Sequence, residues 1–154
     1  MNHPWKILAI VLCLALPGWT LADEDNPDDA AAHVRHALME LMGWNMGTVA
    51  AMSTGKAPYD QARAIDHGER LAALGGMIGD AFERDTSGAE LSRPTQALDA
   101  IWQNKADFTM KATAMVDAAK AYSAAAAESE ATARKAFIKL GGTCKGCHED
   151  FKSE

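Results

Sequence analysis

The chain contains 154 residues, of which 48% are hydrophobic and 23% are charged, and its formal net charge is −6 at pH 7. This length is typical of a single domain that is large enough to bury a hydrophobic core. The acidic balance argues against binding to nucleic acid or to an anionic membrane surface, because both carry negative charge themselves.

The first 22 residues resemble a secretory signal peptide. Lys6 supplies a positive charge, and residues 7–16 form an apolar stretch that is too short to span a bilayer. Residues 20–22 have the character of a small-residue cleavage site. An uncleaved membrane anchor is the alternative, but the acidic residues 23–29 offer no stop-transfer pattern. We therefore expect export to the periplasm and cleavage, which leaves a mature domain of residues 23–154 with no membrane span.

The first half of the mature chain predicts two helices. Ala, Met, Leu, Lys and Glu dominate the composition, and these residues favour helices over strands. The first helix is expected to start with an N-cap at Asn26 and to end at Gly55. The second is expected to start near Asp60 and to weaken at Gly75 and Gly76, because glycine lowers helix stability.

The second half predicts a long connection followed by two more helices. Residues 80–93 are rich in Gly, Ser, Thr and charge, and Pro94 is expected to open a turn into the third helix. The apolar face of that helix is Ile101, Phe108, Ala112, Met115, Ala119 and Tyr122. A turn at residues 128–130 then leads to a fourth helix. Four amphipathic helices with mostly short links predict an all-α fold, an antiparallel up-down four-helix bundle.

The fourth helix ends in the sequence Cys144-Lys145-Gly146-Cys147-His148, which has the pattern Cys-x-x-Cys-His. This pattern is typical of covalent attachment of a c-type haem. Each thiol can bond to one vinyl group of the porphyrin, and the histidine can ligate the iron. The motif therefore predicts one haem c, held by Cys144 and Cys147, with His148 as the proximal iron ligand.

Three other sites use two cysteines at this spacing. A thioredoxin-like redox site needs a βαβ context, and a zinc site needs a second ligand pair at finger-like spacing. The sequence predicts neither. A haem-free helical module with a plain disulfide accounts for the cysteines but leaves the adjacent His148 as a coincidence. Haem attachment is therefore the favoured interpretation.

Gly141 and Gly142 come directly before the motif and each cost a helix about 1 kcal/mol relative to alanine. Two explanations remain open. The missing side chains could let the helix approach a macrocycle or a neighbouring helix closely, or the pair could break the helix and place the motif on a loop.

Four segments together resemble class II c-type cytochromes, the family of cytochrome c′ and cytochrome c-556. They are residues 144–152, residues 35–39, residues 55–60, and residues 101–102. The resemblance covers essentially the whole mature chain. It implies an antiparallel four-helix bundle in which the covalently bound haem packs among the helices near one end.

The resemblance also implies roles for three residues of the first helix. Arg35 matches a family arginine close to a haem propionate, and His36 matches a position that often lines the haem. A solvated charge and a surface histidine are the alternatives for these two. Met39 matches the position that faces the distal side of the iron. A large apolar residue there blocks the site without binding in cytochromes c′, whereas a methionine ligates the iron in the c-556 type.

The sequence thus predicts a periplasmic electron carrier whose haem iron transfers single electrons between redox partner proteins. Asn45 and Met46 also resemble c-556 members and favour ligation by Met39. The alternative is a five-coordinate cytochrome c′ that binds nitric oxide or carbon monoxide. We expect no enzymatic activity, because no nucleophile–base pair is visible. Family members are often homodimers, so the resemblance implies a homodimer formed through the first two helices.

Overall fold

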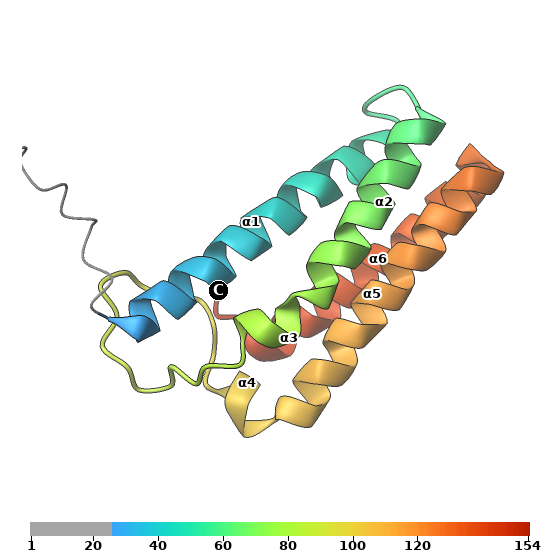
Figure 1. The fold of residues 1–154 in the computed structure, drawn as a ribbon. Helices are drawn as coiled ribbons and strands as arrows, with labels where there is room; N and C mark the ends of the chain where they lie inside the picture. The colour runs from blue at the N-terminus through green and yellow to red at the C-terminus, as the bar shows by residue number, and fades with distance from the viewer. Residues whose placement is uncertain (1–25) are drawn as a thin grey trace, which may run out of the picture.

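The computed structural model describes residues 26–154, so the predicted signal peptide lies outside the described residues. The described residues form helices α1 (Pro27–Ser53), α2 (Gln61–Gly76), α3 (Ile78–Ala81), α4 (Ala100–Gln103), α5 (Lys105–Glu128) and α6 (Glu130–Phe151). The four long helices make an antiparallel bundle, which confirms the predicted fold (Figure 1). Within residues 26–154 no helix is both long and apolar enough to cross a bilayer.

The helix ends lie close to where the sequence predicts them. The side chain of Asn26 caps α1 by accepting a hydrogen bond from the backbone N–H of Asp28 at 2.9 Å. Beyond its other end, Gly55 has φ 77°, a left-handed value that glycine adopts at little cost. The Asp60 side chain caps α2, and Ser129 is the single residue between α5 and α6.

The third predicted helix differs from the observed one, because it is divided into α4 and α5. Asn104 separates the two helices and has non-helical dihedral angles of φ −123° and ψ 48°. Its side-chain amide donates a long hydrogen bond of 3.4 Å to the carbonyl of Ala100. Asparagine competes for backbone hydrogen bonds in this way, so it favours helix ends over helix interiors.

The core lies mainly where α2 packs on α1 and α5, and where α5 packs on α6. The largest fully buried side chains are Tyr122, Leu71, Ile101, Leu140 and Val49. Gly75 lets α2 and α5 approach closely, because a Cβ there would lie 2.8 Å from the Met115 sulfur. By contrast, α1 packs much more on α2 than on α6.

The two glycines before the cysteine motif do not interrupt α6, which runs continuously to Phe151. The alternative that places the motif on a loop is therefore wrong. A Cβ on Gly141 would lie 3.7 Å from the terminal methyl group of Met46, an ordinary contact, and one on Gly142 would meet nothing within 4 Å. Packing between the helices therefore does not require glycine here, and close approach to a macrocycle stays a prediction.

Candidate functional site

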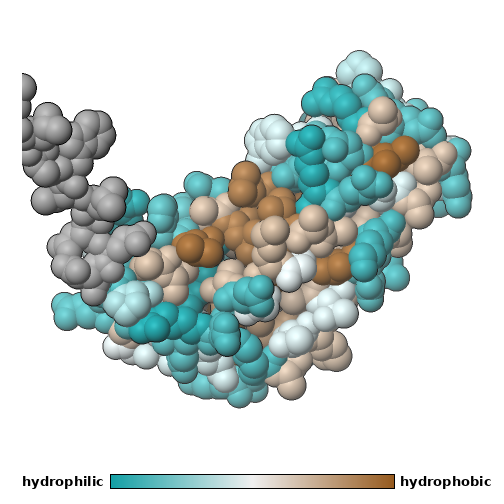
Figure 2. Space-filling view, viewed as in Figure 1, coloured by the Kyte–Doolittle hydropathy of each residue, from teal (hydrophilic) through white to brown (hydrophobic). Residues whose placement is uncertain are grey.

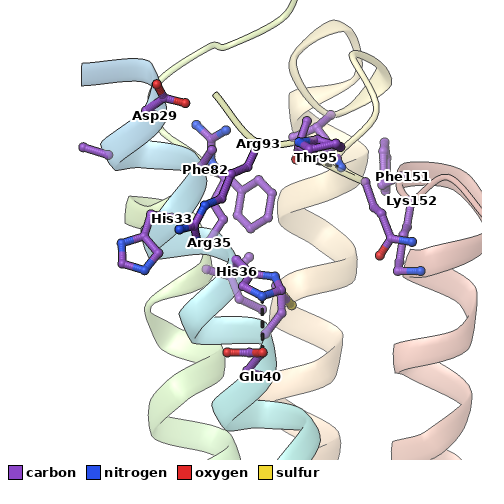
Figure 3. A pocket seen from close by; sticks show the side chains of 18 of the residues that line it. Asp29, His33, Arg35, His36, Glu40, Phe82, Arg93, Thr95, Phe151 and Lys152 are labelled. Atoms are coloured by element: carbon purple, nitrogen blue, oxygen red, sulfur yellow. Dashed lines mark hydrogen bonds and ion pairs between the residues drawn. The ribbon is translucent and has the colours of Figure 1, made fainter. Parts of the chain in front are cut away.

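One end of the bundle contains a cavity of about 1270 Å³ that is bordered by both α1 and α6 (Figure 3). Small-molecule pockets typically measure about 300–1,000 Å³, so this cavity has room for a macrocycle. The large apolar side chains of its lining are Met39, Ile78, Phe82, Ile101, Phe108 and Phe151. The connection between α3 and α4 adds residues 92–97 to the lining.

The cysteine motif meets this cavity at the end of α6. Cys147 and His148 are part of the lining, whereas Cys144 lies one turn earlier and is not. Residues three apart lie on the same side of a helix, so both sulfur atoms face a similar direction. Both cysteines are half-buried free thiols. Burial raises the pKa of each thiol, although Lys111 opposes this effect at Cys147.

His148 is oriented toward the same cavity and is favoured in its neutral form. Its pKa is lowered, chiefly by the loss of hydration beside the protein wall and secondarily by the positive charge of Lys152. A neutral imidazole is the form that ligates a metal ion. The C-terminal turn of α6 therefore presents thiols and an imidazole, the donor set that a c-type haem requires.

Met39 lines the cavity from α1 and is half-buried. The two neighbouring methionines lie elsewhere: Met42 is buried in the core, and Met46 packs against it near Gly141. The structure thus brings Met39 and His148 to one cavity from two helices that are far apart in the sequence. A thioether is a soft ligand that haem iron accepts.

His36 also lines the cavity, but its side chain is 71% exposed and its Nε2 lies 3.2 Å from the carboxylate of Glu40 (Figure 3). An exposed ion pair of this kind contributes little to stability. The structure therefore places His36 at the edge of the cavity, with one face open to solvent, which agrees with both roles considered for it.

Arg35 is buried, with 3% of its surface exposed, so it is not a solvated helix charge. Its guanidinium donates hydrogen bonds to the carbonyl of Ala81 at 2.8 Å, to the hydroxyl of Thr86 at 2.7 Å, and to the carbonyl of Arg84. Burial lowers its pKa, and Asp28 partly compensates. Because these acceptors belong to the last residue of α3 and to the segment that follows it, Arg35 ties this part of the chain to α1.

The same guanidinium lies within cation–π distance of two aromatic rings. The guanidinium carbon, Cζ, lies 5.3 Å from the ring centroid of Phe82 and 5.0 Å from that of Trp102. The Trp102 ring donates to the Phe82 carbonyl at 3.1 Å. Since Phe82 lines the cavity, Arg35 supports the cavity wall as well as lining it.

Arg93 and Lys152 also line the cavity, although neither was predicted as a site residue from the sequence. No local motif marks Arg93, which lies in an irregular connection. Lys152 follows His148 by four residues, and this spacing was the one signal that could have found it, because residues one turn apart share a helix face.

Comparisons with known proteins agree with this geometry. The family model described as Cytochrome C′ matches residues 30–152. A cytochrome c′ of Cereibacter sphaeroides is 33% identical over 150 residues, which are 96% of this chain and 97% of that protein. The crystal structure of cytochrome c′ from Rubrivivax gelatinosus has a TM-score of 0.73 and 31% identity, covering 82% of this chain and 97% of that one.

A further match is a nitric oxide complex of a mutant cytochrome c prime from Alcaligenes xylosoxidans. It has a TM-score of 0.72 and 30% identity, and covers 82% of this chain and 96% of that one. The chain therefore belongs to the cytochrome c′ family of class II c-type cytochromes, which carry a single covalently bound haem c.

Proposed function

We propose that this protein is a periplasmic electron carrier in which Cys144 and Cys147 hold the haem, His148 is the proximal ligand and Met39 is the distal ligand. The observation that carries the proposal is that Met39 and His148 line one cavity from different helices. When bound, the haem supplies an iron that exchanges one electron between its ferric and ferrous states.

The side chains of the chain have distinct tasks in this function. The two cysteines fix the cofactor to α6, and the apolar lining excludes water from it. Ligation of the iron by the His148 imidazole and the Met39 thioether would raise the reduction potential, as in cytochromes with His/Met ligation. The proposal assigns no substrate turnover, and the partners it requires are redox proteins.

A second candidate function is the binding of nitric oxide or carbon monoxide at a five-coordinate iron. The nitric oxide complex of the Alcaligenes xylosoxidans relative favours it. In this case Met39 would pack beside the open coordination position without ligating. Both functions use the same cavity and the same attachment through α6.

The proposed function requires export of the chain. We infer that residues 1–22 are removed and that residues 23–154 form the mature cytochrome in the periplasm. Haem attachment uses both remaining cysteines, since Cys13 is lost with the signal peptide.

We also propose that the mature protein forms a homodimer through α1 and α2. Figure 2 shows hydrophobic residues gathered along α1 on the visible face. The exposed apolar residues of α1 and of the α2–α3 junction are Val34, Leu41, Trp44 and Met77, which are 52–61% exposed. Contiguous apolar surface of this kind commonly marks a protein interface. Sedimentation of the mature cytochrome tests this, and a Trp44→Glu variant should be monomeric.

The axial ligation is tested by absorption spectra of the mature cytochrome with and without carbon monoxide. The electron carrier predicts a low-spin spectrum that carbon monoxide leaves unchanged, and a Met39→Ala variant that becomes high-spin and binds carbon monoxide. Met42→Ala is the matched control and should keep the original spectrum. A high-spin parent protein that already binds carbon monoxide would instead establish the gas binder.

A further inference from the structure

Residues 92–98, which we call the strap, run along the edge of the cavity and are attached to α1 at one end. The carboxylate of Asp29, in the first turn of α1, accepts a hydrogen bond from the backbone N–H of Ser92 at 2.8 Å. Asp29 and Ser92 both line the cavity. The strap therefore begins directly beside the α1 wall.

The other end of the strap is attached to the end of α6. The backbone N–H of Leu98 donates to the carbonyl of Phe151 at 3.1 Å, and the N–H of Ser153 donates to the carbonyl of Gln96 at 2.9 Å. An isolated β-bridge joins Ala97 to Lys152 at the same place. The strap thus connects the helix that carries the cysteine motif to the helix that carries Met39, and it holds Arg93 between them (Figure 3).

Most other cationic groups in the cavity lining already have protein partners. Arg35 donates three hydrogen bonds to acceptors between Ala81, at the end of α3, and Thr86, and His36 pairs with Glu40. The ammonium of Lys152 donates to the carbonyl of Ser153 at 3.3 Å. Within residues 26–154, the guanidinium of Arg93 has no carboxylate within 4.0 Å and no hydrogen bond to the protein.

A c-type haem would add two propionate carboxylates to this cavity. The porphyrin carries them on the edge opposite the vinyl groups that would bond to the cysteines. Asp29 and Glu40 already add negative charge to the lining. A carboxylate in such a setting is stabilised by a guanidinium, which can donate two parallel hydrogen bonds.

We propose that Arg93 is the cationic partner of a haem propionate, held in place by the two attachments of the strap. This inference rests on the proposed haem site, but it moves the propionate contact from Arg35, which the resemblance implied, to a residue of the connection. Arg35 supports the wall, and Arg93 balances the charge of the cofactor. Arg93 is thereby a positioning and tuning residue that sets how strongly the ferric state is favoured.

The experiment is a redox titration of the mature holo-cytochrome in its wild-type, Arg93→Gln and Arg93→Lys forms. Loss of the positive charge leaves the propionate uncompensated, which favours ferric iron, so Arg93→Gln should lower the midpoint potential. Arg93→Lys should restore most of it, because the charge remains. Arg63→Gln removes an arginine on α2 that is not part of the cavity lining and should leave the potential unchanged.

Two further measurements keep the outcome specific. Resonance Raman spectra should show a shifted propionate bending mode in Arg93→Gln and none in Arg63→Gln, a change that a loss of stability alone does not produce. The inference is overturned if the midpoint potential changes no more in Arg93→Gln than in Arg63→Gln. It is also overturned if, in a Lys152→Gln variant measured alongside them, the potential shifts while that of Arg93→Gln does not. A purified mature chain without the mass of a covalent haem would overturn the proposed function as well, and the mass is therefore measured first.

Discussion

The two ends of the bundle are built differently. At the end formed by the α1–α2 turn and the α5–α6 turn, short links join the helices and small residues such as Ala126 and Ala133 are completely buried. The side chain of Arg134 donates to the carbonyl of Ser53 across that end at 2.8 Å. At the opposite end, a long connection runs beside a cavity lined by large side chains. We infer that the closed end is the more stable of the two, and that the cavity end is completed by a cofactor.

The largest expected effect comes from removing both thiols. In a Cys144→Ser, Cys147→Ser variant the covalent haem should be lost completely, because serine forms no thioether. Mass spectrometry and the Soret band measure this loss. Hydrogen exchange should then rise in residues 82–99, whereas α5 near Tyr122 should stay protected. Equal loss of protection at both ends would contradict the division into a stable end and a cofactor end.

The next effect concerns the closed end alone. Met52 is 2% exposed near the end of α1, so Met52→Ala should lower the free energy of unfolding by about 2–5 kcal/mol. The matched control is Met110, which is 63% exposed. Met110→Ala should change the free energy of unfolding by less than about 0.5 kcal/mol. Denaturant unfolding measures both values. The haem spectrum of Met52→Ala should match that of the parent, and a changed spectrum would show that the two ends are coupled.

Arg35→Gln tests the support of the cavity wall. Glutamine cannot make the three hydrogen bonds of the guanidinium, and a buried acceptor that loses its partner costs about 1–3 kcal/mol. We expect that loss of unfolding free energy, together with faster hydrogen exchange in residues 81–86. Glu83→Gln changes an exposed side chain of the same segment and serves as the control, because Arg84 itself pairs with Asp28 of α1. Unchanged exchange in this segment would refute the role of Arg35 as its anchor.

The smallest expected effect is a pH dependence of the free energy of unfolding, which originates at His67 between α1 and α2. His67 is 4% exposed, and its Nδ1 lies 2.8 Å from the side-chain oxygen of Asn45. The amide nitrogen of Asn45 donates to the Leu41 carbonyl, so its oxygen accepts from His67. Burial, reinforced by the positive charge of Arg70, lowers the pKa of His67.

The unfolded chain therefore binds this proton more readily than the folded protein. The stabilising contribution of neutral His67 is complete above the unfolded pKa of about 6.5 and declines as the pH falls below it, by at most about 1.4 kcal/mol per pH unit. Denaturant unfolding between pH 5 and pH 8, roughly spanning that unfolded value, measures the slope. His67→Gln should reduce the slope of the unfolding free energy against pH. A slope identical to that of the parent protein would assign the proton to another group.

The sequence by itself determined the features that depend on neighbouring residues. The caps at Asn26, Asp60 and Ser129 act within a single helix turn, so their patterns predict the helix ends directly. The haem attachment motif is similarly local, because five consecutive residues carry both thiols and the imidazole. The fold class followed from four amphipathic stretches with mostly short links.

Only the tertiary structure decided which side chains meet across the cavity. Arg35 and Thr86 are separated by 51 positions, and the burial that makes this arginine a structural anchor comes from a segment with no regular pattern. The strap gains its attachments from Asp29 and from the end of α6, neither of which a local pattern relates to Arg93. These contacts form only when the helices pack, because the hydrogen-bonding partners of an irregular segment are set by what it lies against.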